Sequence, residues 1–232
     1  MYEFESAIRY SECSPDGKLS VPSLINYFQD VSTFHSESIG EGVFSLKERS
    51  LGWMILSWDI KIDSLPGLGD RIRTGTMSLG AKGIYALRDF VMRSDDKIYA
   101  RAHSIWGLID LNRLMPVKPD QKMMDKFGAE DPLPGEWAGR KMKEPIDKEK
   151  VMEIEAGFFM LDSNGHVNNE KYIELIMSAL KLKDIKRLTV SYRNQALLGD
   201  KLIVWRGKGE DEGLSSIERD DGTVLTVIKY QY

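Results

Sequence analysis

The sequence contains few of the residues that build cross-links and metal sites. Its 1 cysteine, Cys13, excludes an internal disulfide and a cysteine-rich zinc site. Its 3 histidines, His35, His103 and His166, leave little material for a histidine-based metal site. Low cysteine content is also typical of proteins from a reducing compartment. We therefore expect a cytoplasmic protein that uses no metal and no disulfide.

Long apolar runs and an excess of positive charge are also missing. No stretch approaches the roughly 18 apolar residues that a membrane-spanning helix needs. Residues 1–5 do not have the basic start of a secretion signal. The formal net charge is −4, whereas proteins that bind nucleic acid usually carry a basic surface. The sequence therefore predicts no membrane span and no nucleic-acid partner.

Proline is scarce except in one segment, and that segment divides the chain. The segment from residue 115 to 146 contains Pro116, Pro119, Pro132, Pro134 and Pro145 out of 8 prolines in the whole chain. Only residues 121–127 within it have a helical pattern. Prolines at this density interrupt both helices and strands. We therefore expect an N-terminal unit at 1–115, a linker at 116–146 and a C-terminal unit at 147–232.

Hydrophobic periodicity predicts the same order of elements on both sides of this linker. The first half is expected to contain a strand at 4–10, a helix at 20–38, a loop at 43–50, and strands at 51–63, 70–79, 84–92 and 98–111. The second half is expected to contain a strand at 151–161, a helix at 169–182, and strands at 187–196, 201–207, 214–218 and 224–230. This order favours an α+β fold, with a long helix and an antiparallel sheet in each half.

Residues at equivalent places also match, which indicates a tandem repeat. Gly17 to Ile25 aligns without a gap with Gly165 to Ile173. Further along, Leu68-Gly69-Asp70 aligns with Leu198-Gly199-Asp200, and each triplet follows a predicted strand. In this register His166 corresponds to Lys18. One copy is therefore expected to carry chemistry that the other does not have.

Polar residues crowd the junction between strand and helix in the second copy. If the chain stays extended there, Asp162, Asn164 and His166 alternate in position and project to one side. A carboxylate, an amide and an imidazole would then converge, as a hydrolytic site requires. The same residue types are also common in turns and caps, so the pattern alone leaves a structural role open.

The start of the following helix predicts a place for negative charge. The first N–H groups of a helix have no partner within the helix, and the positive end of its dipole lies there. The backbone N–H groups of Val167, Asn168 and Asn169 are therefore candidate donors to an oxyanion. Together with Asp162 or His166 as the base, they would support attack of water on a carbonyl.

The stretch from Leu161 to Ile173 resembles the D-x-N-x-H-V-N-N-x-x-Y-I signature of the acyl-acyl carrier protein thioesterases. Trp106 to Arg113 and Leu188 to Arg193 are similar to two strands of that family. The resemblance implies a tandem (double) hotdog fold, in which each unit is a long helix wrapped by an antiparallel sheet. It also implies hydrolysis of fatty acyl-acyl carrier protein thioesters to free fatty acid in fatty acid biosynthesis, without a cofactor. The first unit would bind the acyl chain, and the second would carry the catalytic motif.

The resemblance implicates Asp162, Asn164 and His166 in catalysis, and one nearby segment departs from the family. Plant members follow a Tyr-Arg pair with Arg-Glu-Cys, and their Glu and Cys have been assigned catalytic roles. This chain has Asn194, Gln195 and Ala196 there. An amide is no base and alanine has no thiol, so a cysteine-based triad is not supported. Gln195 is left as a positioning group.

The resemblance also implies a partner, the acyl carrier protein with its phosphopantetheine thioester. Basic residues suited to an acidic carrier follow the second helix, at Lys181, Lys183, Lys186 and Arg187. A homodimer is also compatible with the sequence. Three alternatives remain open. They are an acyl-coenzyme A thioesterase, a hotdog hydratase, whose D-x-N-P-x-H signature has a proline that is missing here, and a non-enzymatic acyl-binding protein.

Overall fold

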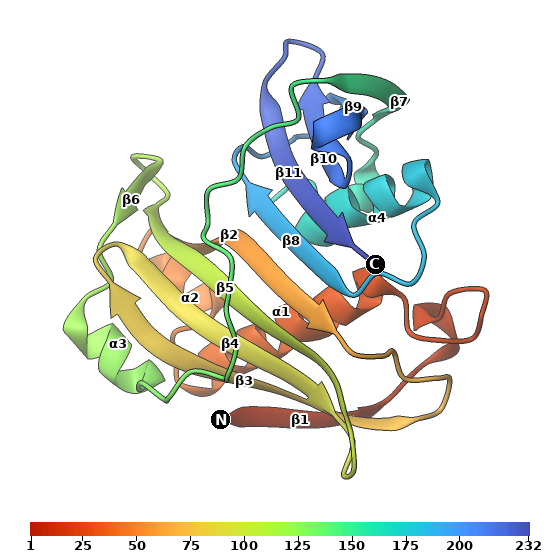
Figure 1. Cartoon of the computed structure of the whole chain (residues 1–232). Helices are drawn as coiled ribbons and strands as arrows, with labels where there is room; N and C mark the ends of the chain where they lie inside the picture. Colours follow the sequence, from red (N-terminus) through yellow and green to blue (C-terminus); the bar gives the residue numbers. More distant parts are fainter. The chain divides into compact units, whose positions relative to one another are not determined.

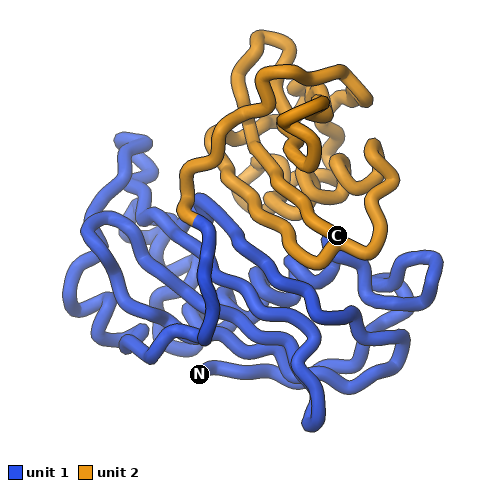
Figure 2. Tube along the Cα trace, in the orientation of Figure 1, with its two compact units in different colours: residues 1–138 blue, residues 139–232 orange.

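The computed structural model describes residues 1–232 and divides into two compact units, Met1–Ala138 and Gly139–Tyr232 (Figure 2). The segment expected to be a linker, 116–146, supplies β6 and α3 to the first unit. None of the helices combines the length and the apolar character that a membrane span requires.

The first unit consists of one antiparallel sheet with a long helix on one face (Figure 1). Its elements are β1 (Tyr2–Ala7), η1 (Tyr10–Glu12), α1 (Val21–Ser38), α2 (Val43–Glu48), β2 (Leu51–Ile62), β3 (Arg71–Lys82), β4 (Tyr85–Arg93), β5 (Ile98–Asp110), β6 (Met115–Val117) and α3 (Gln121–Phe127). The strand order is β1-β3-β4-β5-β2, and β6 pairs with β5. The predicted helix and the four strands after it are confirmed.

The second unit repeats this plan with fewer additions. Its elements are β7 (Lys148–Glu155), η2 (Phe158–Met160), α4 (Asn169–Leu180), β8 (Arg187–Tyr192), β9 (Lys201–Gly207), η3 (Gly209–Asp211), β10 (Leu214–Arg219) and β11 (Val224–Gln231). Its strand order, β7-β9-β10-β11-β8, is that of the first unit. Each unit therefore has the helix-on-sheet arrangement of a hotdog, as the resemblance implied.

Four local predictions are wrong. The strands expected at 4–10 and 187–196 end early, at Ala7 and Tyr192. Residues 43–50 were expected to form a loop, but Val43–Glu48 form α2. Its Leu46 is buried with Leu108 and Phe127, so non-local packing stabilises a helix too short to show periodicity. The strand expected at 151–161 ends at Glu155 and is followed by the short turn η2.

The long helix of the first unit begins and packs as its sequence predicts. Ser20 caps α1, because its side chain accepts a hydrogen bond from the Ser23 N–H at 3.2 Å. Phe28, on the buried face, contacts the rings of Trp58 and Phe90 at centroid distances of 6.1 and 5.3 Å. These aromatic contacts form the centre of the core between α1 and the sheet.

The two units repeat each other down to single hydrogen bonds. In the first unit the Ser14 N–H donates to the Lys18 carbonyl at 2.7 Å, and in the second the Asp162 N–H donates to the His166 carbonyl at 2.8 Å. This agreement confirms the alignment of His166 with Lys18 that the sequence predicted.

A second loop shows the same correspondence. The Gly67 N–H donates to the Asp70 carboxylate at 2.8 Å, and the Leu197 N–H donates to the Asp200 carboxylate at 2.9 Å. Each aspartate therefore closes the turn before β3 or β9. The Leu-Gly-Asp match in the sequence reflects this shared turn.

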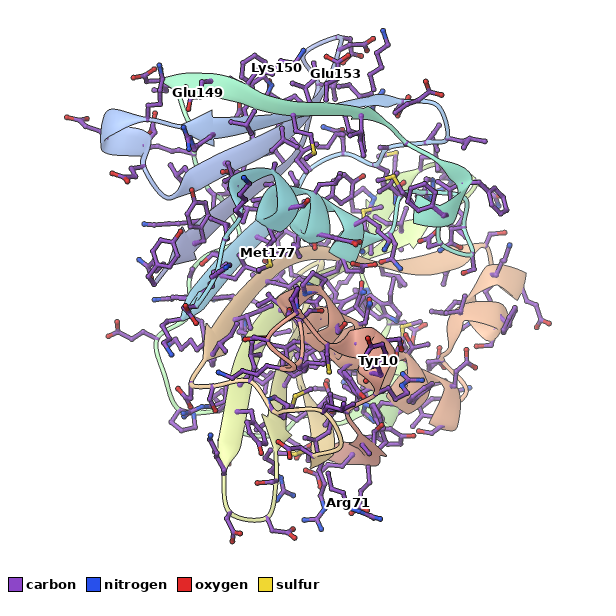
Figure 3. The ribbon with its side chains drawn as sticks, turned by 90° about the vertical axis from the view of Figure 1, so that its right-hand side faces the viewer. Tyr10, Arg71, Glu149, Lys150, Glu153 and Met177 are labelled. Carbon is purple, nitrogen blue, oxygen red and sulfur yellow. The ribbon has the colours of Figure 1, made fainter.

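Charged side chains protect one edge of the second sheet. β7 is the last strand on its side, and Glu149, Lys150 and Glu153 extend from it (Figure 3). Lys150 pairs with Glu153, and Glu149 pairs with Arg206. Charges along an edge strand oppose pairing with strands of other molecules.

A buried polar row holds the segment after α3 onto the first sheet. Asp89 on β4 and Asp59 on β2 both lie opposite His103 on β5. Asp89 Oδ1 lies 2.6 Å from His103 Nδ1, and its other oxygen accepts the Leu133 N–H at 2.7 Å. Asp59 accepts the Ala138 N–H at 2.6 Å. The segment after α3 therefore crosses this face of the sheet, and the carboxylates of Asp89 and Asp59 bind its backbone at Leu133 and Ala138 (Figure 1).

Glu41 links three helices of the first unit and gives it an acid-sensitive contact. The residue is 2% exposed and accepts hydrogen bonds from Lys126 and Arg49. Burial raises the pKa of Glu41, but the hydrogen bonds from Lys126 and Arg49 outweigh it, so the pKa lies below its ordinary 4.5. The contact therefore stabilises the fold above that ordinary pKa and is lost as the pH falls through the lowered value.

We expect Glu41→Gln to lower the free energy of unfolding by about 1–3 kcal/mol near pH 7, the usual range for a lost charged hydrogen bond. The difference from the parent should shrink as the pH falls, because the parent carboxylate is then protonated as well. Urea unfolding at a series of pH values measures it. A difference that stays constant down to the acid limit of folding would contradict this assignment.

Candidate active site

The polar stretch of the second unit forms a tight hairpin turn. The Asp162 N–H donates to the His166 carbonyl at 2.8 Å, and the Gly165 N–H donates to the Asp162 carbonyl at 3.1 Å. Gly165 has a φ of +80°, a left-handed conformation that glycine adopts without strain. The expectation of an extended chain is therefore wrong. The pair Asn164-Gly165 is the reason, because it is a strong turn signal.

The Asp162 side chain helps to build this turn. Its Oδ1 atom accepts the N–H of Asn164 at 2.8 Å and the N–H of His166 at 3.2 Å. Such side-chain bonds to the backbone are typical of aspartate in turns. The second carboxylate oxygen makes no hydrogen bond within the chain. Asp162 therefore has one oxygen committed to structure and one available to a ligand.

The hairpin brings two of the three predicted side chains together. Asp162 and His166 face each other across the turn, while Asn164 lies at its exposed tip. The His166 ring and the Asn164 amide make no hydrogen bond within the chain. Asp162 and His166 therefore occupy paired positions of one turn, joined by the Asp162 N–H bond to the His166 carbonyl and by the His166 N–H bond to Asp162 Oδ1, while Asn164 lies between them in sequence at the exposed tip.

The backbone N–H groups after the turn are not equally available. The Val167 N–H donates to the Ala196 carbonyl and the Asn168 N–H to the Met160 carbonyl, both at 2.9 Å. These two predicted oxyanion donors are already engaged. Asn169 is the first residue of α4, where an N–H has no partner within the helix. Of the three candidate oxyanion donors, only the Asn169 N–H therefore remains available.

Two buried tyrosines hold the parts of the site in place. The Tyr172 hydroxyl accepts the Ala196 N–H at 3.0 Å, and the Tyr192 hydroxyl donates to the Asn169 carbonyl at 3.0 Å. Burial raises the pKa of Tyr172 to about 12 and that of Tyr192 well above its ordinary 10.0. Both hydroxyls therefore stay protonated at neutral pH. The signature tyrosine, Tyr172, gave the only sequence signal for this role.

Gln195 lies in the exposed segment between β8 and β9, one residue before Ala196. Its carbonyl accepts a hydrogen bond from Arg219 at 3.3 Å. The only thiol of the chain, Cys13, belongs to the first unit and donates to the Arg9 carbonyl at 3.3 Å. The chain contains no cluster of three or more histidine, cysteine, aspartate or glutamate side chains suited to a metal.

Comparison with known families gives a match in both units. Residues 1–127 match the model of the acyl-ACP thioesterase N-terminal domain, where ACP is acyl carrier protein. Residues 143–232 match the model of the acyl-ACP thioesterase C-terminal domain.

Curated relatives match most of this chain. The palmitoyl-acyl carrier protein thioesterase of Gossypium hirsutum is 26% identical over 82% of this chain and 50% of its own length. The dodecanoyl-[acyl-carrier-protein] hydrolase of Cinnamomum camphora is 24% identical over 84% and 56%. The chain thus spans about half the length of the curated relatives it matches.

Two solved structures cover nearly the whole chain. An acyl-ACP thioesterase from Bacteroides thetaiotaomicron has a TM-score of 0.88 at 22% identity, over 98% of this chain and 96% of its own. A 12:0-ACP thioesterase from Umbellularia californica has a TM-score of 0.82 at 18% identity, over 99% and 96%. The fold is therefore the double hotdog. With both domain models matched in order along the sequence, this chain belongs to the acyl-ACP thioesterase family.

Proposed function

We propose that this chain hydrolyses fatty acyl thioesters of acyl carrier protein to free fatty acid and carrier protein, as a step of fatty acid biosynthesis. The observation that carries this proposal is the hairpin before α4, which holds Asp162 and His166 at paired positions of one turn and leaves the second carboxylate oxygen of Asp162 without a hydrogen bond within the chain. The first unit has Ser14 and Lys18 at these two places. A purely structural turn requires no such pair.

The chemistry is addition of water to the thioester carbonyl. Asp162 acts as the base that takes a proton from the attacking water, or as a nucleophile that forms an acyl anhydride, which water then hydrolyses. His166 polarises the carbonyl or shares the proton transfer. The Asn169 N–H stabilises the oxyanion, and Asn164 orients water or substrate at the tip of the turn. The carbon–sulfur bond then breaks, and the departing thiolate takes up a proton. Gln195, beside the turn, is a candidate to position the substrate.

The first unit is the proposed place for the acyl chain. Its large apolar side chains include Phe28, Ile55 and Trp58, which are buried, and Phe28 of α1 contacts Trp58 of β2. Phe34, at 45% exposed, lies outside that core. Curated relatives are described as palmitoyl and dodecanoyl thioesterases, so medium and long saturated chains are the first to test.

The test is a panel of acyl-carrier-protein thioesters of graded chain length beside the coenzyme A thioesters of the same acyl groups. Free fatty acid and free thiol should appear together, without added metal or nucleotide. Faster turnover of coenzyme A thioesters would favour the acyl-coenzyme A thioesterase. Absence of release by folded protein over the whole panel would favour an acyl-binding protein, and hydration of an enoyl thioester would favour the hydratase.

A further inference from the structure

Four large apolar side chains stand exposed beside the hairpin of the second unit. Phe158 and Phe159 in η2 are 82% and 80% exposed, and Leu197 and Leu198, between β8 and β9, are 53% and 59% exposed. We call these four residues the apolar rim. Contiguous apolar surface that stays in contact with water is a mark of interaction sites.

The rim borders the candidate site on two sides. On one side, η2 leads into the hairpin, and the Leu161 N–H donates back to the Phe158 carbonyl at 3.2 Å. On the other side, His166 itself pairs with Leu197 in an isolated β-bridge. The rim segments therefore flank the turn that holds His166.

The two segments of the rim are fixed to each other. The Gly199 N–H donates to the Ala156 carbonyl at 2.9 Å, and the Ala156 N–H donates to the Asp200 carbonyl at 2.8 Å. The Phe159 ring packs on Gly157, where an added Cβ would lie 2.7 Å from a ring carbon. The rim is thus presented on a defined backbone.

The repeat shows that this apolar surface accompanies the catalytic motif. The first unit has the same two loops, with Tyr10 and Leu68 at the places of Phe158 and Leu198, and these are 83% and 55% exposed. Ser11 and Gly67 take the places of Phe159 and Leu197. The rim is therefore fully apolar only in the unit that has the Asp162 and His166 pair.

We propose that the apolar rim is the docking surface for the acyl carrier protein, an inference that rests on the proposed function. The thioester is held by its carrier through a phosphopantetheine arm, so the carrier must bind to surface that lies within reach of that arm from Asp162. The rim is exposed apolar surface within that reach, on both sides of the turn. A phosphopantetheine arm by itself is too narrow to cover segments on both sides of the turn.

The charges of the second unit support docking by apolar contact. Lys181 and Lys183, expected from the sequence to attract the carrier, follow the C-terminal end of α4. The hairpin lies at the other end of this 12-residue helix, about 18 Å away at 1.5 Å per residue. Beside the rim, Asp200 lies 3.6 Å from Arg219, so these two charges offset each other. Docking should therefore depend little on salt concentration.

The test uses two double variants, Phe158→Ser with Phe159→Ser and Leu197→Ser with Leu198→Ser. The matched control is Tyr10→Ser with Leu68→Ser, at the equivalent exposed places of the first unit (Figure 3 labels Tyr10). Each is assayed with an acyl-carrier-protein thioester and with the same acyl group on N-acetylcysteamine, which has no carrier. Affinity for a carrier protein with a non-hydrolysable acyl amide is measured by calorimetry in parallel.

We expect each rim variant to weaken carrier binding and raise KM for the protein-borne substrate by about tenfold or more, as loss of buried apolar anchors does. Turnover of the small thioester should stay within about twofold of the parent, and the control should match the parent. Unchanged affinity of the rim variants for the carrier would overturn the proposal, even if the variants had lost binding to lipid vesicles or to a second copy of this chain. An equal loss on both substrates would also overturn it. If the unsubstituted protein hydrolysed neither substrate, the proposed function would be overturned instead. The calorimetry would still show whether the rim binds the carrier.

Discussion

Asp162→Asn is expected to lower kcat/KM for acyl-carrier-protein thioesters by about a hundredfold or more, the usual scale for lost acid-base help. The amide oxygen of asparagine still accepts the N–H groups of Asn164 and His166, so the hairpin should persist. The substitution removes the carboxylate that is proposed to activate water. Steady-state assays give the rate, and the melting temperature checks the fold.

Asp162→Ala separates the two duties of this side chain. Alanine removes the acceptor of the turn as well as the base, so it should reduce stability where asparagine does not. Ser14→Ala, at the equivalent place of the first unit, is the control and should retain parental activity. An asparagine variant within about threefold of the parent would mean that Asp162 serves the turn alone.

Asp89→Ala is expected to cost the first unit about 3 kcal/mol or more of unfolding free energy, as loss of one partner from a buried charged network does. The carboxylate is fully buried and accepts the Leu133 N–H, while His103 Nδ1 lies 2.6 Å from its other oxygen. Alanine leaves both groups without their partner. His103 also stacks on Trp137 at a centroid distance of 5.9 Å, so the segment over the sheet should loosen.

Urea unfolding measures this cost, and limited proteolysis between residues 133 and 146 reports the loosening. The matched control is Asp63→Ala, which removes a half-exposed carboxylate paired with Arg101 on the same sheet. An exposed pair of this kind contributes no more than about 1 kcal/mol. Equal costs for the two substitutions would show that the buried row does not hold the segment.

The order of elements could be predicted from the sequence because it depends on local periodicity. The helix at Val21–Ser38 was predicted from its apolar spacing, a signal that lies within the helix itself. The tandem repeat was visible for the same reason, since Leu-Gly-Asp encodes a local turn in each copy. By contrast, α2 depends on packing of Leu46 against distant residues.

The geometry around the candidate site residues could not be predicted from the sequence. Asp162 and His166 were expected to converge through an extended chain, whereas they lie at paired positions of a turn that Asn164-Gly165 favours, and their catalytic role stays a prediction. The hydrogen bond from the Val167 N–H to the Ala196 carbonyl joins segments far apart in sequence. No local sequence signal could therefore show that this N–H is engaged and not available to an oxyanion. The apolar rim was missed because exposure of Phe158 depends on the whole fold.

The central claim is that the chemistry lies at the hairpin of the second unit, and the repeat supplies its most direct test. His166→Ala and Lys18→Ala change equivalent positions of two turns that share their hydrogen bonds. Release of free fatty acid from the best substrate of the panel is measured for both. We expect a loss of about a hundredfold or more for His166→Ala and parental turnover for Lys18→Ala. Parental turnover for His166→Ala, or an equal loss for Lys18→Ala, would contradict it.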